Sequence, residues 1–160
     1  MPHTLDSWVR ALRAGDTLAK IAAADALAAL GAPAVPALLE TLGSGDAETR
    51  WRAAAALGWI DDSRSSAPLL ALLHESDWSL RHSALWALAM KRDASISAGL
   101  FAVLLDASSE EQIRYLAAMG LAHQQQDALT NRLRALAQDD NELLRRPANA
   151  ALINPAFRPE

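Results

Sequence analysis

The sequence predicts an all-α protein in which about five pairs of short helices stack into a solenoid. Half of its 160 residues are hydrophobic, and Ala and Leu dominate, a composition that favours helix because these side chains lose little rotamer freedom there. A motif recurs along the chain at intervals of 30 to 33 residues. Its internal spacing fits the period of a helix and not that of a strand, and repeats of this length are typical of helical arrays.

The motif is clearest in residues 77–89, DWSLRHSALWALA, where an acidic residue is followed four positions later by a basic one. Ala and Leu follow the basic residue after three and seven positions. We interpret the charged columns as a structural ladder: the acid caps a helix, and the base bonds to an acid of its own or an adjacent repeat. The acid–base pairs are Asp16 and Lys20, Asp46 and Arg50, Asp77 and Arg81, and Glu110 and Arg114, and in the last repeat Asn141 stands in place of the acid before Arg145.

The motif predicts the second helix of each pair, and a shorter apolar segment before it predicts the first helix. These segments contain Trp8, Val9 and Leu12; Leu38, Leu39 and Leu42; Leu69, Leu70 and Leu73; Leu100, Phe101 and Leu104; and Leu133 and Leu136. Prolines such as Pro36 and Pro68 fall near the starts of such segments, where a missing N–H costs little. In order, the predicted helices span residues 5–14, 17–30, 33–43, 47–60, 65–74, 78–91, 95–106, 109–122, 126–138 and 141–153.

Domain organisation follows from the size of one repeat. A pair of short amphipathic helices cannot bury its own apolar face, so neighbouring pairs must stack. We therefore predict a single domain over residues 1–160. Pro147 is expected to kink the last helix or delay its start, and the chain is expected to leave the helix at Pro155. The predicted repeats lie at about 5–31, 33–61, 65–92, 95–123 and 126–153, followed by a tail at 154–160.

The pattern PLLALL followed by D-x-x-x-R-x-x-A-x-x-A-L resembles HEAT repeats, especially the short repeats of the phycobilisome-lyase-like subclass. The segment RWRAAAALGWIDD at residues 50–62 is the best copy. The resemblance covers nearly the whole chain and implies a right-handed α-α superhelix. Proteins with such repeats include protein-binding scaffolds, bilin lyase subunits, an iron-dependent hydroxylase of a modified lysine and DNA-glycosylase relatives, so the fold alone does not choose a function.

Composition narrows the classes of partner. The net charge of −4 and the pI near 5.5 are opposite to the basic surface of a nucleic-acid-binding protein. The absence of cysteine excludes disulfides and thiolate chemistry. No apolar run reaches the roughly 20 residues of a membrane span, and the N-terminus lacks the pattern of a signal peptide. We expect a soluble cytoplasmic protein without nucleic-acid or membrane partners.

The dipeptide His74–Glu75 is a candidate metal site, because the hydroxylase among the HEAT-like proteins holds two irons with repeated His-Glu pairs. This chain has one such pair, since His3, His82 and His123 are not followed by Glu. Metal sites need convergent ligands with supporting partners. We expect no metal and no cofactor.

Large apolar side chains lie on the face of the second helices opposite the predicted core. Counted from the basic residue, columns +1, +5 and +9 share this face at about 100° per residue. In the first repeat these columns hold Ile21, Asp25 and Ala29. The resemblance implies that this face lines a concave groove. The predicted stripe comprises Trp51, Trp59, Trp78, His82, Trp86, Met90, Tyr115, Met119 and His123, with Arg52 and Arg146 beside it as candidate acceptors of an acidic group.

We expect a non-enzymatic scaffold that binds a protein segment along this stripe, because rigid aromatic side chains are typical of binding hot spots. The alternative is a bilin-lyase-like subunit or chaperone that holds a flat conjugated small molecule against the same rings. A hydroxylase-like or DNA-binding role is less favoured. The sequence contains no phosphate loop, metal-ligand spacing or nucleophile elbow, so no catalytic residue is predicted, although an enzymatic role stays open.

Overall fold

The repeated acidic residue caps the second helix in each of the first three pairs, whereas the side chain of Glu110 makes no capping bond to the helix Glu111–His123. The computed structural model describes residues 4–153, and in it a carboxylate oxygen of Asp16 accepts a hydrogen bond from the backbone N–H of Ala19 at 2.8 Å. Asp46 accepts in the same way from Thr49 at 2.7 Å. The corresponding bond to Asp77 is 3.1 Å long. Each bond satisfies an N–H group that the helix itself leaves unpaired, which explains why the motif precedes a helix.

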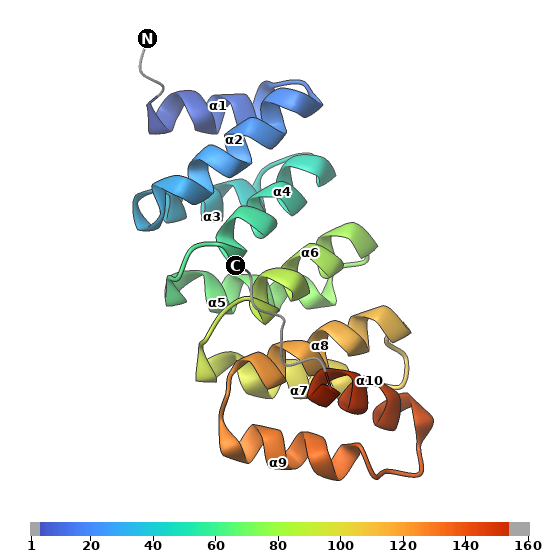
Figure 1. The fold of residues 1–160 in the computed structure, drawn as a ribbon. Coiled ribbons are helices and arrows are strands. Elements are labelled where there is room, and N and C mark those ends of the chain that lie inside the picture. Colours follow the sequence, from blue (N-terminus) through green and yellow to red (C-terminus); the bar gives the residue numbers. More distant parts are fainter. Residues whose placement is uncertain (1–3, 154–160) are drawn as a thin grey trace. The chain divides into compact units, whose positions relative to one another are not determined.

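Within residues 4–153 the structure contains ten α-helices and no strand (Figure 1). Four short 3₁₀ turns lie between them, at Ala32–Ala34, Ser63–Ser65, Leu72–His74 and Ala94–Ile96. The helices are α1 (Leu5–Ala14), α2 (Thr17–Leu30), α3 (Val35–Gly43), α4 (Ala47–Gly58), α5 (Ser66–Ala71), α6 (Trp78–Ala89), α7 (Ser97–Leu105), α8 (Glu111–His123), α9 (Asp127–Leu136) and α10 (Glu142–Ile153).

The predicted all-α class is confirmed, and each predicted helix corresponds to an observed one. The main differences are the 3₁₀ turns, which the helical period does not reveal. Two of them begin with an Asp that bonds locally: Asp62 accepts from the N–H of Arg64 at 3.0 Å, and Asp93 accepts from that of Ser95 at 2.9 Å. Helix α10 begins at Glu142 with Pro147 inside it, so the proline does not delay the helix. The predicted exit at Pro155 lies outside the described residues.

The chain divides into two compact units, Met1–Ala87 and Leu88–Glu160, and the boundary falls within α6. In the N-terminal unit α1 packs on α2, α3 packs on α4, and the second helices α2 and α4 pack against each other (Figure 1). In the C-terminal unit α8 packs on α7, α9 and α10. Each unit thus repeats the same local arrangement. The prediction of one domain over residues 1–160 stays a prediction.

The Ala and Leu columns of the motif form the core. The Ala column is fully buried at Ala23, Ala53, Ala84, Ala117 and Ala148, and the Leu column is fully buried at Leu27, Leu57, Leu88 and Leu121. Alanine at the third position lets the helices approach closely, while leucine one turn later fills the space between them. The periodic columns therefore account for the packing within each unit.

Glycines mark the closest approach of neighbouring helices. A Cβ atom added to Gly58 would lie 2.8 Å from the Cα of Ala87, and one added to Gly120 would lie 3.0 Å from the Cα of Ala89. Real Cβ atoms almost never show a contact as short as that at Gly58, and the contact at Gly120 is tighter than nine in ten real ones. A side chain at either position would push the two helices apart.

Among the described residues, no single helix is both long and apolar enough to cross a membrane. Helices Thr17–Leu30 and Ala32–Gly43 satisfy the length and composition criteria only as a pair, and they are bent by 120° at their junction.

Candidate functional site

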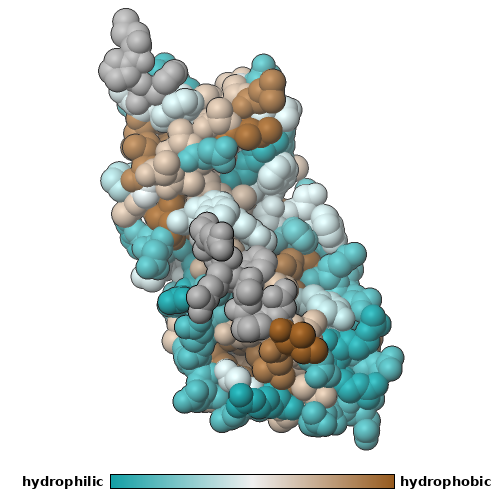
Figure 2. Space-filling model, viewed as in Figure 1, coloured by the Kyte–Doolittle hydropathy of each residue, from teal (hydrophilic) through white to brown (hydrophobic). Residues whose placement is uncertain are grey.

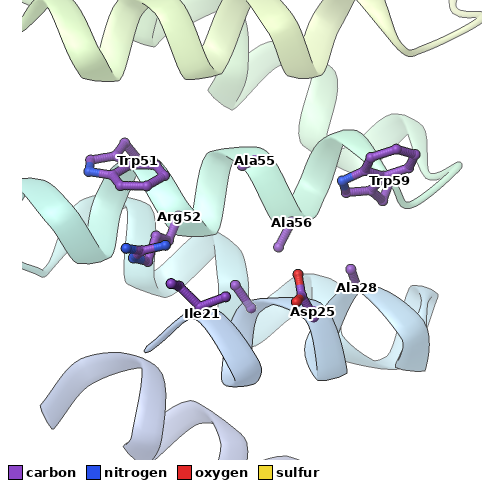
Figure 3. A pocket seen from close by; sticks show the side chains of 9 residues that line it. Ile21, Asp25, Ala28, Trp51, Arg52, Ala55, Ala56 and Trp59 are labelled. Carbon is purple, nitrogen blue, oxygen red and sulfur yellow. The ribbon is translucent and has the colours of Figure 1, made fainter. Parts of the chain in front are cut away.

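An open pocket of about 190 Å³ lies between α2 and α4 in the N-terminal unit (Figure 3). Two of its residues, Trp51 and Trp59, belong to the predicted stripe. The hydropathy surface in Figure 2 shows hydrophobic residues beside hydrophilic ones over this unit. The pocket is lined by Ile21, Ala24, Asp25, Ala28, Trp51, Arg52, Ala55, Ala56 and Trp59.

Helical spacing explains why these side chains meet. On α2, residues 21, 24, 25 and 28 share one face, because helical neighbours recur every three to four positions. Residues 51, 52, 55 and 56 do so on α4, and Trp59 follows directly at its C-terminal cap. Alanines line the middle of the pocket, while the indoles of Trp51 and Trp59 stand at opposite ends of α4 (Figure 3). Small residues between two large ones leave a hollow with aromatic ends.

Arg52 is engaged within the protein. Its guanidinium carbon lies 4.3 Å from the centre of the Trp51 ring, and its Nη2 lies 2.8 Å from Oε1 of Glu48. The guanidinium beside Glu48 lowers the pKa of that carboxyl. Arg52 is only 12% exposed as a side chain. These contacts hold the guanidinium against one wall of the pocket.

Lys20 and Asp46 form a second ion pair between α2 and the start of α4, with 2.8 Å between Nζ and Oδ2. Glu48 lies 3.7 Å from the same ammonium. The hydrogen bond from Lys20, followed by that from the N–H of Thr49, lowers the pKa of Asp46 to about 2. The same bond raises the pKa of Lys20, whose side chain is 7% exposed. Two acids and two bases therefore neutralise one another at this end of the pocket.

Asp25 is the exception to this pairing. It is exposed and lines the pocket, and within residues 4–153 its carboxylate has no hydrogen-bond or ion-pair partner. Figure 3 shows the side chain rising from α2 toward α4, between Ile21 and Ala28. The pocket therefore combines apolar walls with one negative charge that the described residues do not neutralise.

The other stripe residues of the N-terminal unit form two aromatic pairs. Trp59 meets Trp86 edge to face at 5.3 Å between ring centres, and it remains 56% exposed. Trp78 stacks on His82 at 4.9 Å and is 44% exposed. None of Trp78, His82 and Trp86 lines the pocket. These ring contacts hold the indoles of Trp59 and Trp78 while about half of each residue stays exposed.

The stripe residues that follow Ala87 belong to the C-terminal unit. Met90, Tyr115, Met119 and His123 are all half-buried there. Arg146, predicted as a peripheral polar residue, lies 3.2 Å from Glu111. Their part in binding stays a prediction.

The arginines of the ladder mainly donate hydrogen bonds to backbone carbonyls of the segment that precedes their own helix. Arg50 donates to the carbonyl of Leu42 at 2.8 Å and pairs with Glu75 at 2.7 Å. Arg81 likewise donates to the carbonyls of Glu75 and Ser76, and Arg114 donates to the carbonyl of Ser109. Arg145 donates to the carbonyl of Asp139 and to the carboxylate of Glu142. A bond to the ladder acid of an adjacent repeat, as the sequence predicted, joins Lys20 to Asp46.

The His74–Glu75 dipeptide lies at the end of the turn Leu72–His74, where Glu75 is paired with Arg50. The described part of the chain, residues 4–153, contains no cluster of three His, Asp or Glu side chains able to hold a metal ion. His3 lies outside the described residues.

Sequence reasoning missed Ile21 and Asp25 as members of the site. They occupy columns +1 and +5 of the first repeat, the columns that hold Trp51 and Ala55 in the second. The signal was therefore present in the register of the repeats. The predicted stripe contains aromatic, methionine and histidine side chains, and the first repeat has none of these in columns +1, +5 and +9.

Comparison with known proteins relates the chain to one repeat family. A family profile described as HEAT repeats matches residues 5–89. The structure resembles a chain of the CpcE–CpcF complex of phycocyanin lyase from Nostoc sp. PCC7120, with a TM-score of 0.73 and 23% identity over 92% of this chain and 97% of that one. It also resembles human deoxyhypusine hydroxylase in complex with glycerol, with a TM-score of 0.62 and 24% identity over 74% of this chain and 42% of that one.

At these identities the two structures show a shared fold, an α-solenoid of HEAT-type helix pairs, which confirms the predicted fold class and resemblance. The comparison with curated protein sequences finds no match.

Proposed function

This chain belongs to the HEAT-repeat family, and we propose that it is a non-enzymatic binding module that takes a segment of a partner protein on the α2–α4 face. The observation that carries the proposal is the pocket between Trp51 and Trp59. Two indoles fixed on one helix present large apolar area at little entropic cost, which is the chemistry of a binding hot spot. The similarity to a chain of a two-protein complex also supports a protein partner.

The exposed state of Trp59 supports this role further. Trp59 is 56% exposed, whereas an indole that served only to stabilise the fold would be buried more deeply. Ile21, on the facing helix, is 39% exposed as well. Exposed apolar side chains on both sides of a hollow favour an interface over a solvated surface.

The size of the pocket favours a partner side chain over a flat conjugated ligand. Sites that enclose small molecules usually have volumes of about 300–1,000 Å³, whereas this pocket has about 190 Å³. The bilin-lyase-like alternative therefore receives less support from this face. A visible absorbance band in the purified protein would favour that alternative.

Selection of peptides from a random display library on the purified protein tests the proposal. We expect the wild-type protein to enrich peptides with apolar residues, and the double variant Trp51→Ala/Trp59→Ala to lose the selected peptides while keeping its helical circular dichroism. Leu18→Ala is the matched control, because Leu18 is also an exposed apolar residue of the N-terminal unit but does not line the pocket. Binding that survives in the double variant would contradict the proposal.

The remaining stripe residues are proposed contacts for a longer partner segment. Trp78, His82 and Trp86 would extend the surface along α6, and Met90, Tyr115, Met119 and His123 would serve in the C-terminal unit. Methionine side chains adapt their shape to different partners. Loss of binding in Trp78→Ala together with retention in the pocket variant would move the principal contact to the start of α6.

A further inference from the structure

The charge pattern of the pocket identifies the chemistry of its occupant. Arg52, Glu48, Lys20 and Asp46 are already joined in ion pairs near one end of the pocket. Asp25 alone among the charged lining residues has no such partner within residues 4–153. The charge left for a partner to neutralise is therefore negative.

We propose that the pocket takes a lysine or arginine side chain of a partner protein, whose cationic head pairs with Asp25 and whose aliphatic stem lies on the apolar lining. This inference rests on the proposed function and specifies its occupant. Lysine and arginine bury their methylene stems along apolar surface while the charge stays near water. The alanines of the pocket suit the stem, and Asp25 is exposed, so the paired head would stay near solvent.

The exposed indole of Trp59 adds a second attraction for a cation. A positive group above the face of an indole is stabilised by the negative potential of the ring. Trp51 already serves Arg52 in this way, whereas Trp59 meets Trp86 edge to face and remains 56% exposed.

An acidic occupant is disfavoured by the same contacts. Arg52 was expected from the sequence to accept an acidic group, but it lies over Trp51 and is paired with Glu48. A carboxylate entering the pocket would have to displace Glu48 and would face Asp25. Residues 1–87 also carry ten acidic side chains against seven basic ones, a formal net charge of −3 that attracts cations.

The test uses random-peptide display selections on four purified proteins: wild type, Asp25→Asn, Asp25→Lys and the control Asp6→Asn. Asp6 is an exposed acid of the same unit that does not line the pocket, so its substitution removes the same charge elsewhere. We expect wild type and Asp6→Asn to enrich peptides that carry Lys or Arg beside apolar residues. Asp25→Asn should lose the basic preference, and Asp25→Lys should reverse it toward acidic peptides.

One selected peptide is then synthesised with its basic residue intact and with norleucine in its place. For an ion pair that stays accessible to solvent, we expect Asp25→Asn to weaken the intact peptide about two- to fivefold. The norleucine peptide should bind wild type and Asp25→Asn with equal affinity, because the two changes remove the same interaction. Rising salt should weaken the intact peptide on wild type more than on Asp25→Asn.

Selected peptides that are neutral or acidic, or an intact peptide that binds wild type and Asp25→Asn equally, would overturn the assignment of a basic occupant. If those peptides were still lost in Trp51→Ala/Trp59→Ala, the proposed binding function would stand. Failure of wild type to enrich any peptide would overturn both proposals.

Discussion

The ammonium of Lys20, on α2, lies 2.8 Å from Oδ2 of Asp46, the residue that caps α4. The other carboxylate oxygen of Asp46 accepts the N–H of Thr49 at 2.7 Å. One side chain therefore both begins a helix and joins it to the second helix of the preceding repeat. Substitutions of Lys20 or Asp46 should therefore change how the first two repeats are aligned, in addition to removing the ion pair.

Replacement of Asp46 by Asn should change how stability depends on pH. The pKa of Asp46 is lowered from 3.8 to about 2, first by the hydrogen bond from Lys20. A lowered pKa stabilises the folded state above the unfolded pKa, and this contribution is lost as the pH falls from about 3.8 toward about 2. Asn keeps a capping oxygen but has no charge to lose. Urea unfolding at several pH values should show wild type more stable at pH 6, with the difference shrinking in acid. A constant difference across this range would contradict the assignment.

Replacement of Lys20 by Met should raise the pKa of Asp46 above about 2, because the bond from Lys20 is the largest cause of the shift. The pKa should stay below 3.8, since the N–H of Thr49 still donates to the carboxylate. Titration of the carboxyl carbon by NMR measures the change directly. Arg10→Met removes a positive charge from the exposed side of α1 and serves as the control. If the pKa of Asp46 rises equally in both variants, the loss of any positive charge, and not the loss of the hydrogen bond from Lys20, would account for the change.

Gly58→Ala should destabilise the N-terminal unit by about 1–3 kcal/mol, the usual cost of overpacking. Its new Cβ would lie 2.8 Å from the backbone of Ala87 and 3.1 Å from the ring of Trp86. Chemical unfolding of wild type and Gly58→Ala measures the difference in their free energies of unfolding. Gly43→Ala is the matched control, because nothing lies within 4 Å of a Cβ at the end of α3. Equal stability of the two variants would show that α4 and α6 can separate without cost.

Gln125→Gly should stabilise the C-terminal unit by about 0.5–1 kcal/mol. Gln125 has a φ of 52° just beyond the end of α8, a conformation that costs other residues about 1–2 kcal/mol and that glycine adopts freely. Part of the gain is offset by the larger entropy of glycine in the unfolded chain. The control is Gln126→Gly, since Gln126 has a φ of −97° and no strain to relieve. In thermal unfolding, the melting temperature of Gln125→Gly should lie above that of wild type, and the melting temperature of Gln126→Gly should lie at or below it.

The sequence alone determined the helices, their pairing and the buried columns. Asp46 and Ala53 could be assigned to a cap and to the core because a period of 3.6 residues decides which side chains share a face. A capping carboxylate likewise acts on the N–H groups three residues ahead, so its role is local. The 3₁₀ turns escaped prediction, because short polar side chains such as Asp62 bond to the nearby backbone without any repeating pattern.

The tertiary structure alone decided which side chains remain available for a partner. From the sequence, Arg52 was a candidate acceptor of an acidic group beside the stripe, and Asp25 occupied a stripe column of the first repeat without a predicted role. In space Arg52 reaches Glu48 and Trp51, while Asp25 lines the pocket without a partner among the described residues. Helical periodicity predicts which face of its own helix a residue occupies. Arg52 and Glu48 lie one turn apart on α4, a spacing that a local pattern can indicate. That Asp25 of α2 lies beside residues of α4 in the pocket depends on the distance between helices, which no local pattern encodes.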